Sequence, residues 1–160
     1  MITDGFVREM ATFSRWQNDT VYHLCDEIGD AERNLDRGMF FGSIHKTLDH
    51  ICVVNRNILT FLNGALPERY ASKGAVWPDW DDLKAVRLEQ DELLSAGADE
   101  WTEKWLSAAP TKRDLQAPDL PTVPRWVMVV QIFHHQTHHR SQVTSALHAM
   151  GIDYGTTDIP

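Results

Sequence analysis

The chain has 160 residues, of which 42% are hydrophobic, so it is long enough to form one domain with a substantial core over residues 1–160. Its formal net charge is −8 and its Lys and Arg residues do not cluster, which argues against a nucleic-acid partner. No apolar run approaches the ~20 residues of a membrane span, and the first residues lack the order of a signal peptide, so we expect a cytoplasmic protein with no membrane partner.

Two helices are predicted in the N-terminal half. Apolar residues spaced mainly by three, four and seven predict the first over Val7–Ile28, ended by Gly29. The stretch Asp30–Gly38 is then expected to be a charged connection. Ser43 belongs to the residue types that cap helix N-termini, so the second helix is predicted from there to about Leu62.

A long loop and a third helix are predicted next. Gly74, Pro78 and a pair of tryptophans favour a loop over Pro67–Asp82. Apolar residues at helical spacing then predict a helix over Asp81–Ser107, with Gly97 as the expected place for a kink.

The C-terminal part is predicted to hold a crossover and a fourth helix. Four prolines in Ala108–Pro124 exclude a helix or a central strand there. The fourth helix is expected over Arg125–Met150, with Gly151 ending it. Four long helices joined by two long connections predict an all-α fold, a four-helix bundle with long crossover connections.

Four of the eight histidines fall within six residues of the fourth helix. Imidazole is the commonest protein ligand for transition metals, and histidines four apart on a helix can share one ion. This spacing occurs as His134/His138 and as His135/His139. On a helical wheel His135 and His139 lie at the edge of the apolar stripe, whereas His134 and His138 lie with the serines on the other side. The inward pair is therefore predicted to be His135 and His139.

The second helix supplies a third candidate ligand. His50 lies at the edge of its apolar stripe, just as His135 does on the fourth helix. His45 points elsewhere and is expected to be exposed or packed locally, and Asp49 is expected to be a solvated carboxylate. Three imidazoles are typical of catalytic sites that keep one position open. Hydrogen-bonded core histidines remain the alternative interpretation of this pattern.

Three stretches together resemble the DinB family, also called the DinB/YfiT-like metalloenzymes. They are Trp16-Gln17-Asn18, the segment Asp36–His50 and the segment His135–Gln142. The resemblance covers most of the chain and implies a four-helix bundle with a divalent metal on three histidines. Those positions are His50, His135 and His139 in this sequence.

The chain departs from the family pattern at two places. Arg140-Ser141-Gln142 stands where the family usually has Arg-Gly-Gln, and because Ser141 lies on the polar face we expect a change in packing, not in ligation. The usual tryptophan after the second-helix histidine is absent, with Asn57 and Ile58 in that region. The second departure bears on the shape of the pocket and on the substrate.

The resemblance implies a metal-dependent enzyme such as a thiol S-transferase that uses a low-molecular-weight thiol as cosubstrate. Three imidazoles suit zinc, nickel, copper or iron, and zinc or nickel is the expected ion. An open metal position would activate a thiol or water for a small-molecule substrate. The alternative is a non-catalytic stress-response protein in which the metal is structural. A fourth protein ligand, such as Asp49 or Glu27 turned inward, would favour that alternative.

A homodimer is also expected. The family often pairs in this way, and six tryptophans with several apolar helix flanks exceed what one small core need bury.

Overall fold

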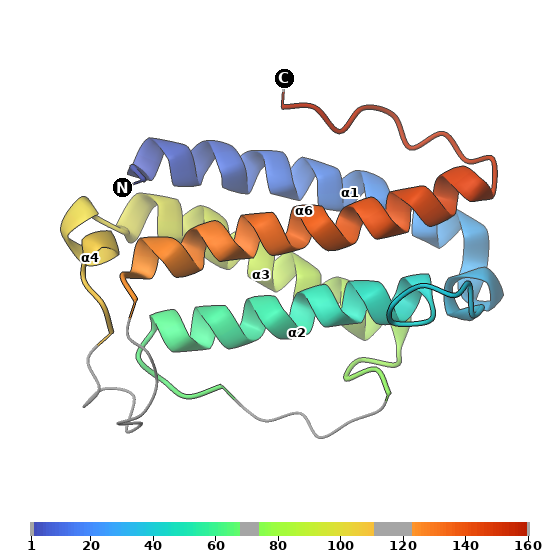
Figure 1. The fold of residues 1–160 in the computed structure, drawn as a ribbon, viewed down its shortest axis with the longest axis horizontal. Helices are drawn as coiled ribbons and strands as arrows, with labels where there is room; N and C mark the ends of the chain where they lie inside the picture. Colours follow the sequence, from blue (N-terminus) through green and yellow to red (C-terminus); the bar gives the residue numbers. More distant parts are fainter. Residues whose placement is uncertain (1, 68–73, 111–122, 160) are drawn as a thin grey trace.

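The computed structural model describes residues 2–67, 74–110 and 123–159, and in these ranges it contains five helices and no strand. Four long helices lie side by side, and the short α4 lies at one end (Figure 1). The helices are α1 (Asp4–Asn34), α2 (Ile44–Leu62), α3 (Trp80–Glu100), α4 (Glu103–Ser107) and α6 (Arg125–Ala149). The predicted all-α class is confirmed. The predicted crossover over 108–124 falls largely outside the described residues.

The long helices pack in pairs. Contacts are most extensive between α1 and α3 and between α2 and α6, and further contacts of α1 with α6 and of α2 with α3 close the arrangement. In the part of the chain that the structure describes, no helix combines the length and apolar character needed to span a bilayer.

The ends of α2 and α6 agree with the sequence prediction to within a residue or two. Ser43 caps α2, since its hydroxyl accepts a hydrogen bond from the Lys46 amide at 3.2 Å. After α6 the chain turns at Gly151, whose φ of 79° is in the left-handed region that glycine adopts without strain.

The first helix continues beyond its predicted end. Gly29 does interrupt the helical backbone, with φ 77° and ψ 171°, but one more turn follows to Asn34. The side chain of Arg33 reaches back and donates a hydrogen bond to the Cys25 carbonyl at 2.7 Å. This hydrogen bond satisfies a carbonyl near the break at Gly29. Because the helix continues to Asn34, the predicted connection begins later than expected.

The predicted single helix over 81–107 is wrong, because α3 ends at Glu100 and a second, short helix follows. Trp101 and Thr102 are extended, and Thr102 caps the separate helix α4 by accepting from the Trp105 amide at 3.2 Å. Trp101 packs back over Gly97, where a Cβ atom would overlap its indole ring. Gly97 thus permits the fold-back of Trp101 and does not itself kink α3.

Two apolar clusters fill the core, and buried polar residues separate them along every long helix. The first cluster includes Cys25, Leu48, Leu83 and Leu147, and the second includes Val7, Leu62, Leu94 and Ile132. We call the buried polar residues between them the central polar layer, which consists of Ser14, Gln17, Asn18, Asn55, Arg87, Gln90, Asp91, Gln136, His139 and Arg140.

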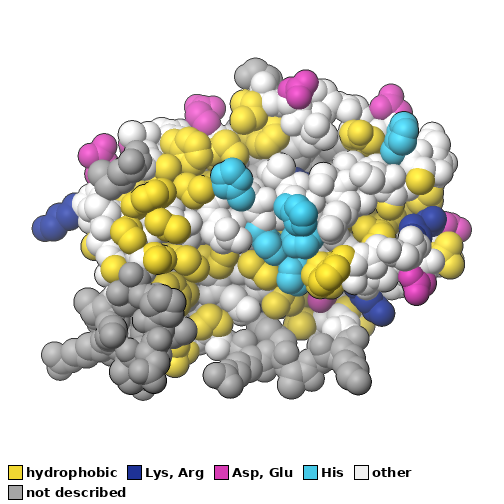
Figure 2. Space-filling model, in the orientation of Figure 1, with side chains coloured by type: hydrophobic (Ala, Val, Ile, Leu, Met, Phe, Trp, Pro, Cys, Tyr) yellow, Lys and Arg dark blue, Asp and Glu magenta, His cyan; other side chains and the backbone are white. Residues whose placement is uncertain are grey.

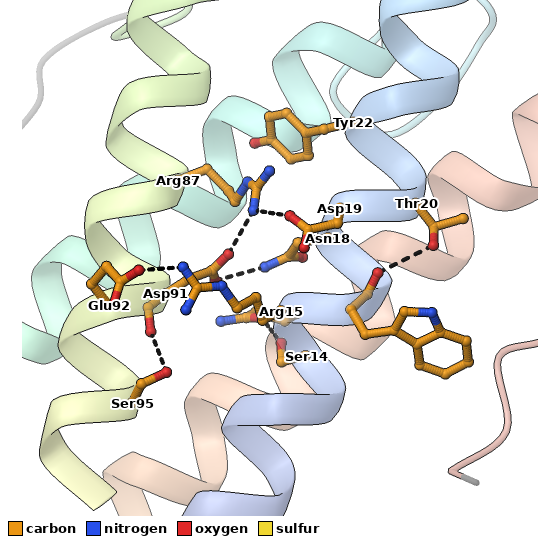
Figure 3. A network of polar contacts seen from close by, with 12 residues as sticks. Ser14, Arg15, Asn18, Asp19, Thr20, Tyr22, Arg87, Asp91, Glu92 and Ser95 are labelled. Carbon is orange, nitrogen blue, oxygen red and sulfur yellow. Dashed lines mark hydrogen bonds and ion pairs between the residues drawn. The ribbon is translucent and has the colours of Figure 1, made fainter.

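On the α3 side, the central polar layer is an ion-pair network. Arg87 donates to Asp91 at 2.9 Å and to Asp19 at 2.6 Å, and Asn18 donates to the other Asp91 oxygen at 2.9 Å (Figure 3). Burial raises the pKa of Asp91, and its hydrogen bonds with Arg87 and Asn18 oppose this effect. Asn18 extends the network to α6, because its amide oxygen accepts from Arg140 at 3.0 Å.

Candidate metal centre

Three histidines from two helices meet at one place. His50 of α2 and His135 and His139 of α6 bring their ligand nitrogens within 4.8 Å of one another. The Nε2 atoms of His50 and His135 are 3.1 Å apart. The sequence singled out the same three residues, and the packing of α2 on α6 is what brings them together.

The donor set suits a transition-metal ion. Zinc binds imidazole nitrogen at about 2.0–2.1 Å, so two nitrogens on a tetrahedral ion are about 3.3–3.4 Å apart. The separation of the His50 and His135 nitrogens is close to this value. Three neutral imidazoles also match the ligand preferences of zinc, nickel, copper and iron.

The site is open to solvent on one side. His139 is buried, whereas His50 and His135 are each only half-buried. Histidine side chains gather in the middle of the face that α2 and α6 present in Figure 2. The rings of His50 and His135 are therefore partly exposed to solvent on this face.

Burial keeps two of the imidazoles neutral. It lowers the pKa of His50 to about 4, and the neighbouring His139 adds to this effect. Burial likewise lowers the pKa of His135 to about 4, with contributions from His139, His50 and His138. Both rings are thus unprotonated at neutral pH and need release no proton to bind an ion.

A hydrogen bond fixes the orientation of the third imidazole. Nδ1 of His139 donates to the side-chain oxygen of Gln142 at 2.9 Å, which leaves the lone pair of Nε2 free for a ligand bond. The sequence contained Gln142 in the segment that resembles the family, but its role was not predicted. The spacing of three residues on one helix was the available signal.

An aromatic ring covers one side of the site. Phe41 stacks on His50 with ring centres 4.0 Å apart and lies 5.5 Å from the ring of His139. The turn before α2 positions Phe41, since the Gly42 carbonyl accepts a hydrogen bond from the backbone amide of Arg37 at 2.8 Å. Gly42 has a φ of 88°, which disfavours any other residue there. Sequence reasoning missed this role of Phe41, because it depends on a turn and not on helical periodicity.

The second histidine pair of α6, His134 and His138, lies on the solvent side of the helix, as predicted. His134 and His138 are exposed, and Ser141 is exposed on the same side of the helix. His138 still touches the ring of His139 edge-on, with centres 4.7 Å apart.

The prediction of a solvated Asp49 is wrong. Asp49 is buried and accepts hydrogen bonds from the backbone amides of Val76, at 3.1 Å, and Trp77, at 2.7 Å. Burial raises its pKa, and these two hydrogen bonds oppose that effect. His45 is fully buried and hydrogen-bonds the Trp77 carbonyl at 2.8 Å, in line with the local-packing alternative. Both side chains anchor the segment before α3.

Neither carboxylate considered as a fourth ligand belongs to the group. Asp49 is engaged with the backbone before α3, and Glu27 lies 3.4 Å from His23 on the exposed side of α1. Within the described ranges, the group consists of the three histidines.

Comparison with known proteins agrees with this arrangement at the level of the family. A search of curated proteins and a search of solved structures each found no match. The model of the DinB family, in contrast, matches residues 1–160, the whole chain. With its helical fold and its group of three histidines, the chain belongs to the DinB family.

Proposed function

We propose that His50, His135 and His139 bind one divalent transition-metal ion and that the protein is a metal-dependent enzyme of the thiol S-transferase type. The observation that carries the proposal is the convergence of three imidazoles from α2 and α6, two of which are only half-buried. A closed structural site would need a fourth protein ligand, and in the described residues the group offers three.

The chain's own residues would prepare the site for chemistry. Gln142 orients His139, and the neutral rings of His50 and His135 accept an ion without losing protons. Phe41 excludes water from one side of the site. A bound divalent ion would lower the pKa of a thiol or water at the open position and so supply a nucleophile at neutral pH.

Metal analysis of protein purified without an affinity His-tag and reconstituted with zinc or nickel tests the site. We expect about one ion per chain, lost in His50→Ala, His135→Ala and His139→Ala. The matched controls are His134→Ala and His138→Ala, which remove an exposed imidazole from the same helix and should keep the ion. Ion content near zero, or loss of the ion in the control variants alone, would overturn the assignment.

A screen with low-molecular-weight thiols tests the reaction class. Disappearance of free thiol in the presence of an electrophile should require the ion and should fail in His139→Ala. The second candidate function, a structural metal in a stress-response protein, predicts a different result. In that case removal of the ion lowers the unfolding temperature, while no thiol is consumed with or without the ion.

A further inference from the structure

A groove formed by α1, α6 and the C-terminal tail lies on a different side of α6 from the candidate metal ligands His135 and His139, and His134 lines one end of it. The tail runs back along these two helices (Figure 1), and the Thr156 carbonyl accepts from Gln17 at 3.1 Å. The groove consists of two cavities of about 240 and 250 Å³. Phe13, Thr137 and Thr157 line both, so the cavities lie next to each other.

The two halves of the groove differ in chemistry. One half is apolar, and its walls include Phe6, Met10 and Phe133. The other half is lined mainly by hydroxyl and amide side chains, and Arg140 is the one charged residue in its lining. Together the cavities reach the size range of about 300–1,000 Å³ that is usual for small-molecule sites.

Arg140 carries a buried positive charge without a direct carboxylate partner among the described residues. Its Nη1 atom donates to three neutral oxygens, those of Ser14 at 2.8 Å, Asn18 at 3.0 Å and Gln136 at 2.9 Å. Its Nη2 atom makes one weak contact, with the Thr137 hydroxyl at 3.5 Å. Thr137 belongs to the groove, so the less satisfied edge of the guanidinium faces that side.

From this arrangement we infer that the groove is a second ligand site, which binds a small organic carboxylate with an apolar tail. The carboxylate accepts hydrogen bonds from Arg140, whose planar fork matches its geometry, and supplies the negative charge that the guanidinium lacks. The tail occupies the half formed by Phe6, Met10 and Phe133. The site is distinct from the metal centre, because Thr137 and His135 point to nearly opposite sides of α6.

Calorimetric titration of the full chain with octanoate, octanol and acetate tests the inference. We expect octanoate to saturate at one molecule per chain. Octanol lacks the charge and acetate lacks the tail, so each should bind about tenfold more weakly or worse. Equal binding of octanoate and octanol would overturn the role of Arg140, and absence of octanoate binding would overturn the site.

A blocking variant locates the bound octanoate. Thr137→Trp places a large ring in the groove at an exposed position and should abolish octanoate binding while metal content stays unchanged. The matched control is Thr12→Trp, at an exposed threonine of α1 outside the groove lining, which should bind octanoate normally. Octanoate binding that survives Thr137→Trp would refute the assignment. Arg140→Gln should reduce octanoate binding to the level of octanol. Because Arg140 also holds Ser14, Asn18 and Gln136 together in the core, its replacement affects folding as well, so Thr137→Trp is the deciding variant.

Discussion

Gln142 is the side chain that orients one of the three candidate metal ligands, His139. Its amide oxygen holds Nδ1 of His139, so its removal frees the ring to rotate. Loss of such an orienting partner typically weakens metal binding about 10–100-fold. We therefore expect Gln142→Ala to lower metal affinity by this factor, as measured by competition with a chromogenic chelator.

Ser141→Ala is the control for this change. Ser141 is the exposed neighbour of Gln142, and its hydroxyl donates to the His138 carbonyl at 2.7 Å without touching His139. It should bind metal as the unaltered protein does. Equal affinities of the two variants would show that Gln142 does not orient the ligand.

The metal-free protein should lose stability on acidification. The folded-state pKa of His50 and of His135 is about 4, below the ordinary value of 6.5. The unfolded chain therefore binds more protons, and the stability present in full above pH 6.5 is lost as the pH falls toward 4. Both rings are half-exposed, so we expect about 1–2 kcal/mol from each histidine, after discounting for solvent screening.

Denaturant unfolding from pH 7 to pH 4 measures this dependence. The raised pKa values of Asp49 and Asp91 act in the opposite direction, so the comparison needs a variant that lacks only the imidazoles. The double variant His50→Asn/His135→Asn should lose less stability across this range. Parallel curves for the two proteins would show that the imidazoles titrate normally in the folded state.

At the scale of elements, the junction of α3 and α4 depends on the absence of a Cβ atom at Gly97. A Cβ atom on Gly97 would overlap the ring of Trp101, which is itself stacked on Trp105 with ring centres 5.2 Å apart. Overpacking of this kind costs about 1–3 kcal/mol and outweighs the gain in helix propensity. Gly97→Ala should lower the free energy of unfolding by about that amount in urea titration.

Two further variants isolate the cause. Gly5→Ala adds the same methyl group to α1, where the nearest atom is 3.6 Å away, and should be neutral or slightly stabilising. Removal of the indole in Gly97→Ala/Trp101→Ala should make the added methyl harmless relative to Trp101→Ala alone. If Gly97→Ala lowers the free energy of unfolding by the same amount when Trp101 is already alanine, the strain does not come from the indole ring.

The sequence predicted the long helices better than their polar interior. Ser43 and Gly151 are local signals with known backbone preferences, and they marked the ends of α2 and α6 correctly. Periodicity also placed His50, His135 and His139 beside the apolar stripes. The break at Trp101 could not be predicted in this way, because it depends on the fit of a ring over Gly97.

Long-range hydrogen bonds account for the other gaps. Asp49 lies on the helix that carries His50, yet its partners are backbone amides far along the chain. The central polar layer depends likewise on pairings between helices, such as that of Asn18 with Asp91. A polar residue in one helix gives no indication of a partner on another, so helical wheels assign such residues to solvent.

At the scale of the whole molecule, we propose a homodimer formed through surfaces away from the metal centre. Leu88 and Leu93 of α3 remain exposed on the described surface, and burial of apolar flanks of this kind favours symmetric pairing. Light scattering at micromolar concentration should give twice the chain mass of 18.3 kDa. The dimer should persist in His50→Ala, because α3 carries none of the three histidines.

Replacement of the two exposed leucines by aspartate tests whether this surface of α3 forms the dimer. Leu88→Asp/Leu93→Asp should be monomeric, whereas Leu35→Asp, which alters a leucine of similar exposure outside α3, should remain dimeric. A mass of one chain that does not change on tenfold concentration would refute the dimer, and a dimeric double aspartate variant would refute this surface.

The protein's own thiols have a consequence for any chemistry with external thiols. Cys25 and Cys52 are fully buried, and burial raises the pKa of each to about 12. They are therefore protonated and shielded in the folded state, and neither forms mixed disulfides or reacts readily with alkylating reagents. The folded protein contributes no background signal to a colorimetric thiol assay, and a slow rise in reactive thiol reports unfolding.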